Sequence, residues 1–297
     1  MNAFLLAWRA SRWLPVNIVR FLAWALAMVG WATHANAARR LEDNLARVTG
    51  ADGRTLRRMS RRGMASVARY YAEVLEMSRL DGDTVDARVR CEASDEVLAI
   101  FGGEDAAIAA LGHCGNWDLV GAYACRNLMR VTAVAEVLKP REVFEEFVEL
   151  RARHGMTILG HEGSTTFRSL IRIARSETTL VCLVADRDLS GSGIEVSMWG
   201  RTVKVAPGPA ALAAATGRPI LPVHVRYERL HGARRRAARS RWGTVLSFGP
   251  VIDPARFEGE RRVEHMTQEW ATSLAEAVAA HPEDWHMLQR FGWAGES

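Results

Sequence analysis

Short apolar runs alternate with segments of helical periodicity along most of the chain after residue 100. Each run is four to seven residues long, which is the usual length of a buried strand. Several segments between the runs repeat apolar residues at intervals of three and four, as helices do. Strands that alternate with helices predict an α/β fold, in which a mostly parallel central sheet is flanked by helices. The predicted strands are 106–111, 131–137, 179–185, 220–225 and 245–248, and the predicted helices are 118–128, 143–155, 166–176 and 209–217.

The N-terminal stretch, residues 4–38, has a different pattern. It is rich in Leu, Ala and Trp, but Arg9, Arg12 and Arg20 interrupt it. The longest uncharged apolar run, 21–32, has 12 residues, whereas a helix that spans a bilayer needs about 20. Three interpretations remain: a signal peptide cleaved at an Ala-Asn-Ala sequence, a buried helix, or a helix that lies in a membrane interface.

Tryptophan favours the interfacial interpretation. Ten tryptophans occur in the chain, and four of them lie in this stretch close to basic residues: Trp8, Trp13, Trp24 and Trp31. Indole rings and basic side chains both place an apolar body in lipid and a polar tip in water. We therefore expect a membrane-associated helical segment at the N-terminus, followed by one domain without repeats or polar linkers.

Two arginine clusters add to the basic character of the chain. Residues 39–80 have helical periodicity and contain Arg54, Arg57, Arg58, Arg61 and Arg62. These side chains either form a solvated helix face or contact acidic lipid headgroups. The second cluster, HGARRRAARSRW at 231–242, lies between two predicted strands as a long hairpin or loop. It is either solvated or binds phosphate groups or an anionic bilayer.

Composition narrows the class of protein. With 297 residues, 48% of them hydrophobic, the chain can bury the core of one large α/β domain. Its formal charge of +5 and pI near 9.4 come mostly from arginine, which suits phosphates or anionic headgroups. A nucleic-acid-binding protein would not need the apolar N-terminus, and no nucleic-acid-binding module is recognisable. Four cysteines without C-x-x-C spacing predict reduced thiols in a reducing compartment, with no disulfide framework or zinc site: Cys91, Cys114, Cys125 and Cys182.

The sequence LGHCGNWD at 111–118 carries the strongest candidate chemistry. It lies where a predicted buried strand turns into a helix, and ligands of such sheets bind outside the carboxyl ends of the strands. His113 at the strand end and Asp118 at the helix start can meet there, so that the carboxylate fixes the imidazole tautomer. The alternative is structural, with a turn histidine and an aspartate that complements the helix dipole. Asn116 is the expected N-cap.

Nucleophilic mechanisms have less support. Cys114 is next to His113, but adjacent residues of an extended stretch project in opposite directions. The chain has no G-x-S-x-G elbow, no G-x-x-x-x-G-K phosphate loop and no G-x-G-x-x-G fingerprint. We therefore expect His113 to deprotonate a substrate hydroxyl that attacks an acyl carbon directly.

Five ordered blocks of sequence resemble one family. They are RRLEDNLARV, HCGNWD with its H-x-x-x-x-D motif, LVADRDLSGSGIEVSMWG, VAPGPAALAAATGRPILPV and the ending HPEDWHMLQRFGW. Over nearly its whole length the chain is similar to the lysophospholipid acyltransferase superfamily. The branch that it resembles includes the late acyltransferases of lipid A and the actinobacterial phosphatidylinositol mannoside acyltransferases. The residues of the blocks NLARV and DWHMLQRFGW resemble the mannoside enzymes more than the lipid A enzymes. The resemblance implies a hydrophobic membrane-associated segment at 1–40 and an acyltransferase domain at 41–297.

The same resemblance implies roles for individual residues. His113 would be the general base, and Asp118 would hold it or a neighbouring arginine. An acidic residue downstream completes a relay to the histidine in this family. Asp186 and Asp188 of the DRD element are candidates here, with Glu195 as a third, and the sequence does not decide among them. Three further residues would belong to the acceptor pocket, or alternatively form surface or structural ion pairs: Glu136, Arg151 and Arg187.

The implied reaction transfers a long-chain acyl group from a thioester of coenzyme A or acyl carrier protein to a sugar hydroxyl of a membrane glycolipid. The expected acceptor is the mannose of a phosphatidylinositol mannoside. The reaction needs a base and donors for the oxyanion, and it requires no metal or redox cofactor. The acyl chain needs an apolar groove, which the neighbourhoods of Trp117 and Trp199 or the N-terminal helices would line.

Alternatives to this reaction stay open. One alternative acceptor is a lysophospholipid or a lipid A-like precursor. Another alternative is water in place of the hydroxyl, as in a thioesterase. The implied partners are acyl-CoA, an anionic glycolipid and the cytoplasmic face of the cell membrane, where the protein would be peripheral or monotopic. The second arginine cluster, at 231–242, would then be a candidate for the phosphates of coenzyme A.

Overall fold

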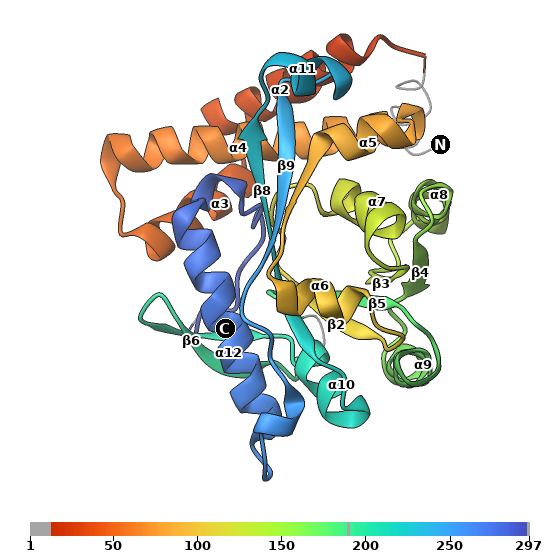
Figure 1. The fold of residues 1–297 in the computed structure, drawn as a ribbon. Helices are drawn as coiled ribbons and strands as arrows, with labels where there is room; N and C mark the ends of the chain where they lie inside the picture. Colours follow the sequence, from red (N-terminus) through yellow and green to blue (C-terminus); the bar gives the residue numbers. More distant parts are fainter. Residues whose placement is uncertain (1–12, 189–190, 296–297) are drawn as a thin grey trace.

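A seven-stranded sheet forms the centre of the computed structural model, which describes residues 13–188 and 191–295 (Figure 1). The strand order is β1-β9-β8-β2-β5-β3-β4. Neighbouring strands run parallel except for β8 and β9, which are antiparallel. The predicted α/β class with a mostly parallel sheet is therefore confirmed. The strands are β1 (Val89–Glu92), β2 (Ala107–Leu111), β3 (Val131–Ala135), β4 (Thr157–Gly160), β5 (Leu180–Val184), β8 (Ile220–Arg229) and β9 (Trp242–Phe248).

Each of the five predicted apolar runs forms a strand of this sheet, and β8 and β9 extend beyond their runs. The prediction missed β1 and β4. Both are edge strands with partly exposed side chains, so they lack the continuous apolar run of β2, whose five residues are all buried. It also missed a separate antiparallel hairpin, β6 (Ile194–Met198) and β7 (Arg201–Val205), whose outward side chains are polar.

The two faces of the sheet pack against different helices. Successive side chains of β2 alternate between two cores, Ile108 and Ala110 in one, and Ala107, Ala109 and Leu111 in the other. The first core is shared with α9 (Ser164–Ser176), α10 (Gly208–Thr216) and α12 (Arg262–Ala280). The second is shared with α5 (Gly82–Arg88), α6 (Asp95–Phe101), α7 (Trp117–Asn127) and α8 (Arg141–Arg153). The four predicted helices correspond to α7, α8, α9 and α10.

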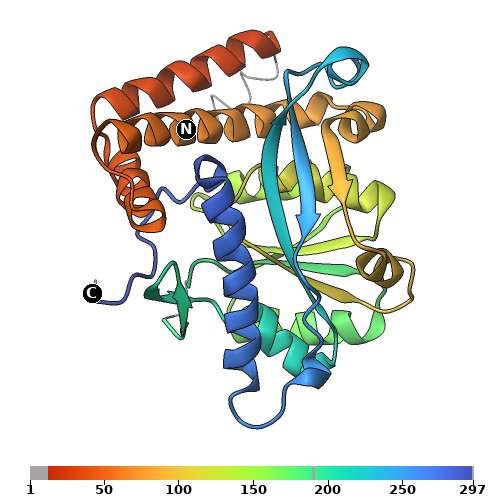
Figure 2. The same ribbon diagram turned by 60° about the vertical axis from the view of Figure 1, so that its left-hand side comes forward.

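Three N-terminal helices, α2 (Val16–Ala32), α3 (Asn36–Thr49) and α4 (Gly53–Glu76), pack together beside the sheet, with α2 lying along α4 (Figure 2). A small apolar core joins α3 to α4 through Leu41, Leu45 and Met64. The boundary expected at residue 40 falls inside α3, so α3 belongs in part to each of the two segments that the sequence suggested.

The helix α2 exposes its apolar residues. None of its side chains is buried, and four large ones are more than half exposed: Phe21, Leu22, Leu26 and Val29. Arg20 faces the protein instead and pairs with Glu76 of α4 at 2.7 Å, on the side of α2 that packs against α4. In the part of the chain that the structure describes, no helix by itself has the length and hydropathy of a membrane span; the bent pair α2 and α3, at 73°, meets both criteria together. Of the predicted N-terminal segment, Trp8, Arg9 and Arg12 lie outside the described residues.

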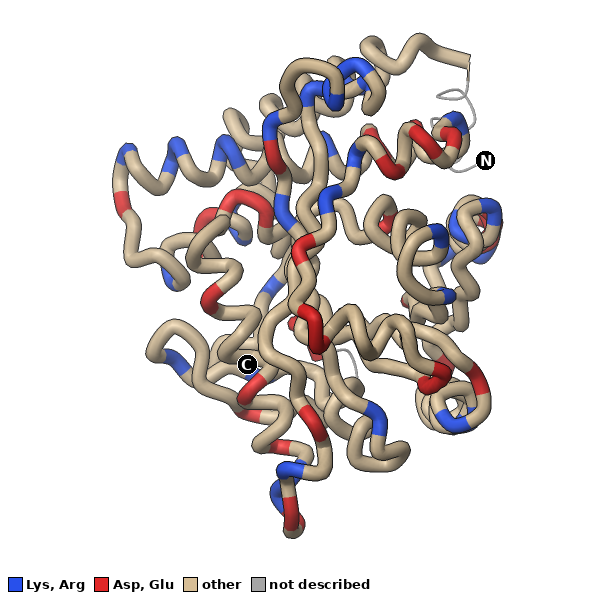
Figure 3. The backbone as a smooth tube through the Cα atoms, viewed as in Figure 1, with Lys and Arg blue, Asp and Glu red and all other residues tan. Residues whose placement is uncertain are grey.

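The first arginine cluster lies along the first half of α4, beside α2 (Figure 3). Arg57 stacks over the ring of Trp31 at 4.0 Å and pairs with Glu42 at 3.2 Å. The stacked guanidinium links α4 to α2, so this arginine has a structural contact in addition to its position on the surface.

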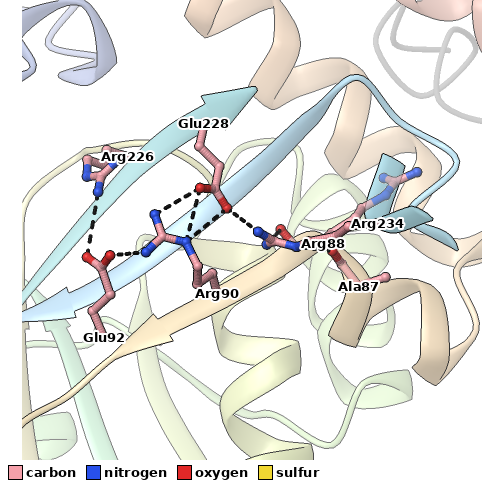
Figure 4. A network of polar contacts seen from close by, with 7 residues as sticks. All are labelled: Ala87, Arg88, Arg90, Glu92, Arg226, Glu228 and Arg234. Carbon is pink, nitrogen blue, oxygen red and sulfur yellow. Dashed lines mark hydrogen bonds and ion pairs between the residues drawn. The ribbon is translucent and has the colours of Figure 1, made fainter. Parts of the chain in front are cut away.

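The second cluster connects β8 to β9 through the short helix α11 (Gly232–Ala237), so the predicted hairpin is confirmed. Arg234 donates to Glu228 at 2.6 Å and to the main-chain oxygen of Ala87 at 2.9 Å. Glu228 also accepts from Arg90 of β1, in a network that joins β1 to β8 across the intervening strand β9 (Figure 4). Arg234 therefore stabilises the sheet edge.

Candidate active site

The loop 112–116 joins β2 to α7 at the carboxyl edge of the sheet. One of its positions requires glycine, and a second leaves little room for a side chain. Gly115 has a φ of +53°, and a β-carbon there would lie 2.9 Å from the main-chain oxygen of Val225. A β-carbon on Gly112 would lie 3.2 Å from Oδ2 of Asp186. The side chain of Asn116 accepts from the N–H of Leu119 at 2.9 Å, which confirms the predicted N-cap.

His113 forms a close pair with Asp186. Its Nδ1 lies 2.6 Å from Oδ1 of Asp186, and its main-chain N–H donates to Oδ2 of the same carboxylate at 2.9 Å. The sheet register explains the contact. Leu111, at the end of β2, is paired with Val184, at the end of β5, and His113 and Asp186 each come two residues after these positions. Asp186 is fully buried, whereas the side chain of His113 is 37% exposed and therefore accessible to a substrate.

Asp186 controls the protonation of His113. Burial disfavours the charged ring, but the charge of Asp186 and its hydrogen bond outweigh burial and raise the pKa of His113 above its ordinary value. Burial also acts on the Asp186 carboxyl, but the charge of His113 and the donated hydrogen bonds lower its pKa. Because an ionised carboxylate only accepts, Nδ1 of His113 carries the proton and Nε2 is left to accept another. The ring is thus oriented as a general base.

Asp118 contacts an arginine and a tyrosine instead of His113. Its Oδ1 accepts from Nε of Arg151 at 2.6 Å, and its Oδ2 accepts from the hydroxyl of Tyr70 at 2.9 Å. Asp118 is in the first turn of α7, from which its side chain reaches α4 and α8, the helices that carry these partners. The sequence left two partners open for Asp118, either His113 or a neighbouring arginine. The structure shows the arginine, Arg151, as its partner.

The other predicted site residues have different partners. Asp188 accepts from the main-chain N–H of Gly193 at 2.7 Å. Glu195 lies in β6, is exposed and pairs with Lys204 of β7 at 3.7 Å. Of the three acidic relay candidates, Asp186 is thus the one in contact with His113. Two further predicted residues act on the His113 ring through their charge: Arg187 lowers its pKa and Glu136 raises it. Among the described residues, no group of three or more His, Cys, Asp or Glu is placed to hold a metal ion.

An apolar cavity lies between α7 and the sheet. Trp117 lines it together with Val120, Met156 and Ile158, and its charged lining residues are Asp118 and Arg151, which neutralise each other. The guanidinium of Arg151 also lies over the Trp117 ring at 5.2 Å.

Trp199, the other tryptophan expected near an acyl groove, is part of the core. It packs with Trp285, Phe291 and Trp293 in an aromatic cluster, and its indole donates to the main-chain oxygen of Ala275 at 2.9 Å. It therefore contributes to packing.

Cys114 points away from His113. Its buried side chain lines a separate cavity of about 320 Å³ together with His224 and Ser273. Burial raises the pKa of the Cys114 thiol well above its ordinary value. A thiol that stays protonated is a poor nucleophile, in agreement with the opposite side-chain directions expected for neighbouring residues.

Sequence reasoning did not single out Trp285, which contacts the same carboxylate as His113. The indole N–H of Trp285 donates to Oδ2 of Asp186 at 3.0 Å, and the next residue, His286, donates its main-chain N–H to the main-chain oxygen of His113 at 2.7 Å. The only signal in the sequence was the block HPEDWHMLQRFGW, which does not indicate a partner.

The chain is similar to known proteins over most of its length. The family model described as bacterial lipid A biosynthesis acyltransferase matches residues 2–291. A phosphatidylinositol mannoside acyltransferase of Mycolicibacterium smegmatis is 30% identical over 284 residues, which cover 95% of this chain and 88% of the relative. A phosphatidylinositol mannoside acyltransferase of Mycobacterium tuberculosis is 32% identical over 297 residues, which cover 97% of this chain and 86% of the relative.

Among solved structures, the chain is similar to a 1-acyl-sn-glycerophosphate acyltransferase from Thermotoga maritima. The sequences are 14% identical and the TM-score is 0.41, with 89% of this chain and 96% of the other covered.

Proposed function

Because the chain belongs to the bacterial lipid A biosynthesis acyltransferase family, we propose that it transfers an acyl group from acyl-CoA to a mannose hydroxyl of a phosphatidylinositol mannoside. The observation that carries this proposal is the pair of His113 and Asp186, whose ring nitrogen and carboxylate lie 2.6 Å apart at the carboxyl edge of the sheet. The motif supplies a base but no activated enzyme nucleophile. Such a base serves direct attack by a substrate hydroxyl.

The reaction begins with neutral His113. Its Nε2 accepts the proton of the mannose hydroxyl while the hydroxyl oxygen attacks the carbonyl carbon of the thioester. Asp186 accepts from Nδ1 throughout and stabilises the imidazolium that forms. Collapse of the tetrahedral intermediate breaks the carbon–sulfur bond, and the proton passes from Nε2 to the leaving thiolate. The products are the ester and free coenzyme A, and His113 is neutral again.

The start of α7 supplies donors for the oxyanion of the intermediate. In the first turn of a helix, main-chain N–H groups have no carbonyl partner within the helix. Asn116 caps the N–H of Leu119, which leaves those of Trp117 and Asp118 next to the His113 loop. We assign these two N–H groups to the oxyanion, which the positive end of the helix dipole also stabilises.

The cavity beside Trp117, about 50 Å³ in volume, is the proposed entrance for the first carbons of the acyl chain. Its lining is apolar, and its two charged residues, Asp118 and Arg151, are paired with each other at 2.6 Å. An ion pair that is already satisfied leaves no unpaired charge for a hydrocarbon chain to bury. The carbonyl carbon would then lie at the start of α7, between Nε2 of His113 and the oxyanion donors.

The acceptor headgroup is proposed to lie near Glu136, which follows β3 and whose charge acts on His113. A carboxylate can accept hydrogen bonds from sugar hydroxyls, and loss of such a bond costs about 1.5–3 kcal/mol. We predict that Glu136→Ala raises the KM for the phosphatidylinositol mannoside roughly tenfold to a hundredfold. The KM for acyl-CoA should change much less. Steady-state transfer of radiolabelled acyl groups measures both constants.

Glu195→Ala is the matched control, because this exposed glutamate pairs with Lys204 on the β6–β7 hairpin. It should leave both constants unchanged. Equal transfer by the unmutated protein to lysophospholipids or glycerol phosphate would defeat the mannoside assignment. Release of free fatty acid in place of any transfer would identify a thioesterase.

We also propose that the protein binds the cytoplasmic face of the cell membrane through α2. The exposed apolar residues of this helix suit a lipid interior, and the arginines of the neighbouring α4 suit anionic headgroups. The pairing of Arg20 with Glu76 holds the apolar side outward. This arrangement would present the membrane-bound acceptor to the protein.

The proposed membrane contact predicts the behaviour of a double variant, Leu22→Glu with Leu26→Glu. These side chains are one helical turn apart and are 52% and 75% exposed, so the fold should tolerate the change. Burying two leucines contributes roughly 3 kcal/mol or more, so vesicle binding should fall at least about 100-fold. Sedimentation with phosphatidylcholine vesicles, with and without phosphatidylinositol, measures this change.

Leu98→Glu, on α6 and 48% exposed, is the control that should bind normally. Undiminished binding by the double variant would refute the assignment to α2.

A further inference from the structure

The segment around residue 285 pairs with the loop that carries His113. The main-chain N–H of Gly115 donates to the oxygen of Asp284 at 2.9 Å, and the N–H of His286 donates to the oxygen of His113 at 2.7 Å. Between them, Cys114 and Trp285 form an isolated antiparallel bridge. The end of the chain thus acts as a short extra strand against the loop.

Trp285 completes the surroundings of the Asp186 carboxylate. Oδ2 accepts two hydrogen bonds, from the indole of Trp285 at 3.0 Å and from the main chain of His113 at 2.9 Å. Oδ1 is left for Nδ1 of His113 at 2.6 Å. Rotation of the carboxylate would break all three contacts, and Asp186 is fully buried, so no water is at hand to replace them.

Trp285 is itself held in place from two directions. The centroid of its ring lies 5.0 Å from that of Phe291, with the two rings edge to face, and 5.5 Å from that of Trp199. The preceding residue, Asp284, accepts from the hydroxyl of Ser66 at 2.7 Å and from the main-chain N–H of Tyr227 at 2.8 Å. A donor fixed in this way is suited to holding another group in one orientation.

We propose that Trp285 is a positioning residue of this protein, whose indole N–H holds the Asp186 carboxylate so that Oδ1 faces Nδ1 of His113. It does not touch substrate and acts only through Asp186. The consequence for the rate rests on the proposed function, whereas the consequence for the hydrogen bond between Asp186 and His113 does not.

The hydrogen bond can be observed directly by proton NMR. The Nδ1 proton of His113, shared with a carboxylate at 2.6 Å, should give a far-downfield resonance that is absent from His113→Ala. In Trp285→Phe this resonance should broaden or move upfield, because the carboxylate is no longer held. Trp293→Phe is the matched control, since Trp293 belongs to the same aromatic cluster but donates to Asn44 at 2.8 Å. It should keep the resonance.

Steady-state kinetics add a second readout. Misplacement of the base affects the chemical step more than binding, so kcat of Trp285→Phe should fall about tenfold with both KM values within about twofold. Should Trp285→Phe fail to fold, benzothienylalanine at position 285 provides the same test, because it keeps the shape of tryptophan and lacks the N–H. An unchanged downfield resonance in either variant would overturn the proposal. This test needs no substrate, so it stands even if His113→Ala retains transfer activity and the proposed function fails.

Discussion

Replacement of His113 by alanine is expected to lower the rate of acyl transfer about 100-fold or more, because general base catalysis contributes 10²- to 10⁴-fold. Without the ring, the one remaining described side-chain partner of Asp186 is the indole of Trp285, which cannot take the proton of the attacking hydroxyl. The measurement is the kcat of purified protein with acyl-CoA and the mannoside acceptor. Thermal unfolding should show an intact fold, since the His113 side chain is partly exposed and its main-chain hydrogen bonds remain.

Cys114→Ala is the control for this experiment. Its thiol is buried on the other side of the loop, and the rate should stay within a few-fold of normal. Full activity in a folded His113→Ala protein would show that His113 is not the general base. A covalent acyl group trapped on Cys114 would show that the reaction proceeds through an acylated thiol, and it would contradict direct transfer.

Replacement of Asp186 by asparagine is expected to have an effect of similar or greater size. An asparagine keeps the shape of the side chain but removes the charge that stabilises the imidazolium, and it can leave the ring in the wrong tautomer. The corresponding change in a serine protease triad lowers kcat about 10⁴-fold, and we expect a loss of roughly 10³-fold here. Asp188→Asn is the matched control, because Asp188 accepts from Gly193 instead of from His113. Equal losses in both variants would contradict the relay through Asp186.

The pH dependence of the Asp186 variant provides an independent check. His113 acts as a base only when neutral, so kcat/KM falls as pH drops through its pKa. In the unmutated protein Asp186 raises the pKa of His113, so this acid limb lies above the ordinary value for histidine. In Asp186→Asn the burial of the ring and the charge of Arg187 then lower the pKa of His113, and Glu136 opposes them. The residual activity should therefore extend to lower pH than that of the unmutated protein. An acid limb that stays in place would show that another group titrates.

Local sequence determined the central strands, the helices between them and the position of the motif. Central strands are covered on both faces and are therefore mostly apolar, so β2, β3 and β5, none of whose residues is exposed, could be predicted from their residues alone. The turn after β2 could be predicted as well, because the positive φ of Gly115 and the N-cap Asn116 are local requirements. The blocks that resembled the lipid A acyltransferase branch also sufficed to identify the family, and the family match over 2–291 confirms this prediction.

The partners of the motif residues were decided by tertiary structure. The sequence left Asp118 as a possible partner of His113, five residues away, and left three acidic residues open for the relay. The parallel register of β2 and β5 instead brings Asp186 to His113 across 73 residues, while α4 and α8 bring Tyr70 and Arg151 to Asp118. Trp285 reaches Asp186 across 99 residues through the pairing of its segment with the His113 loop. Periodicity reports which face of an element is buried. It carries no information on which elements become neighbours or in what register, because these depend on how all the buried faces pack together.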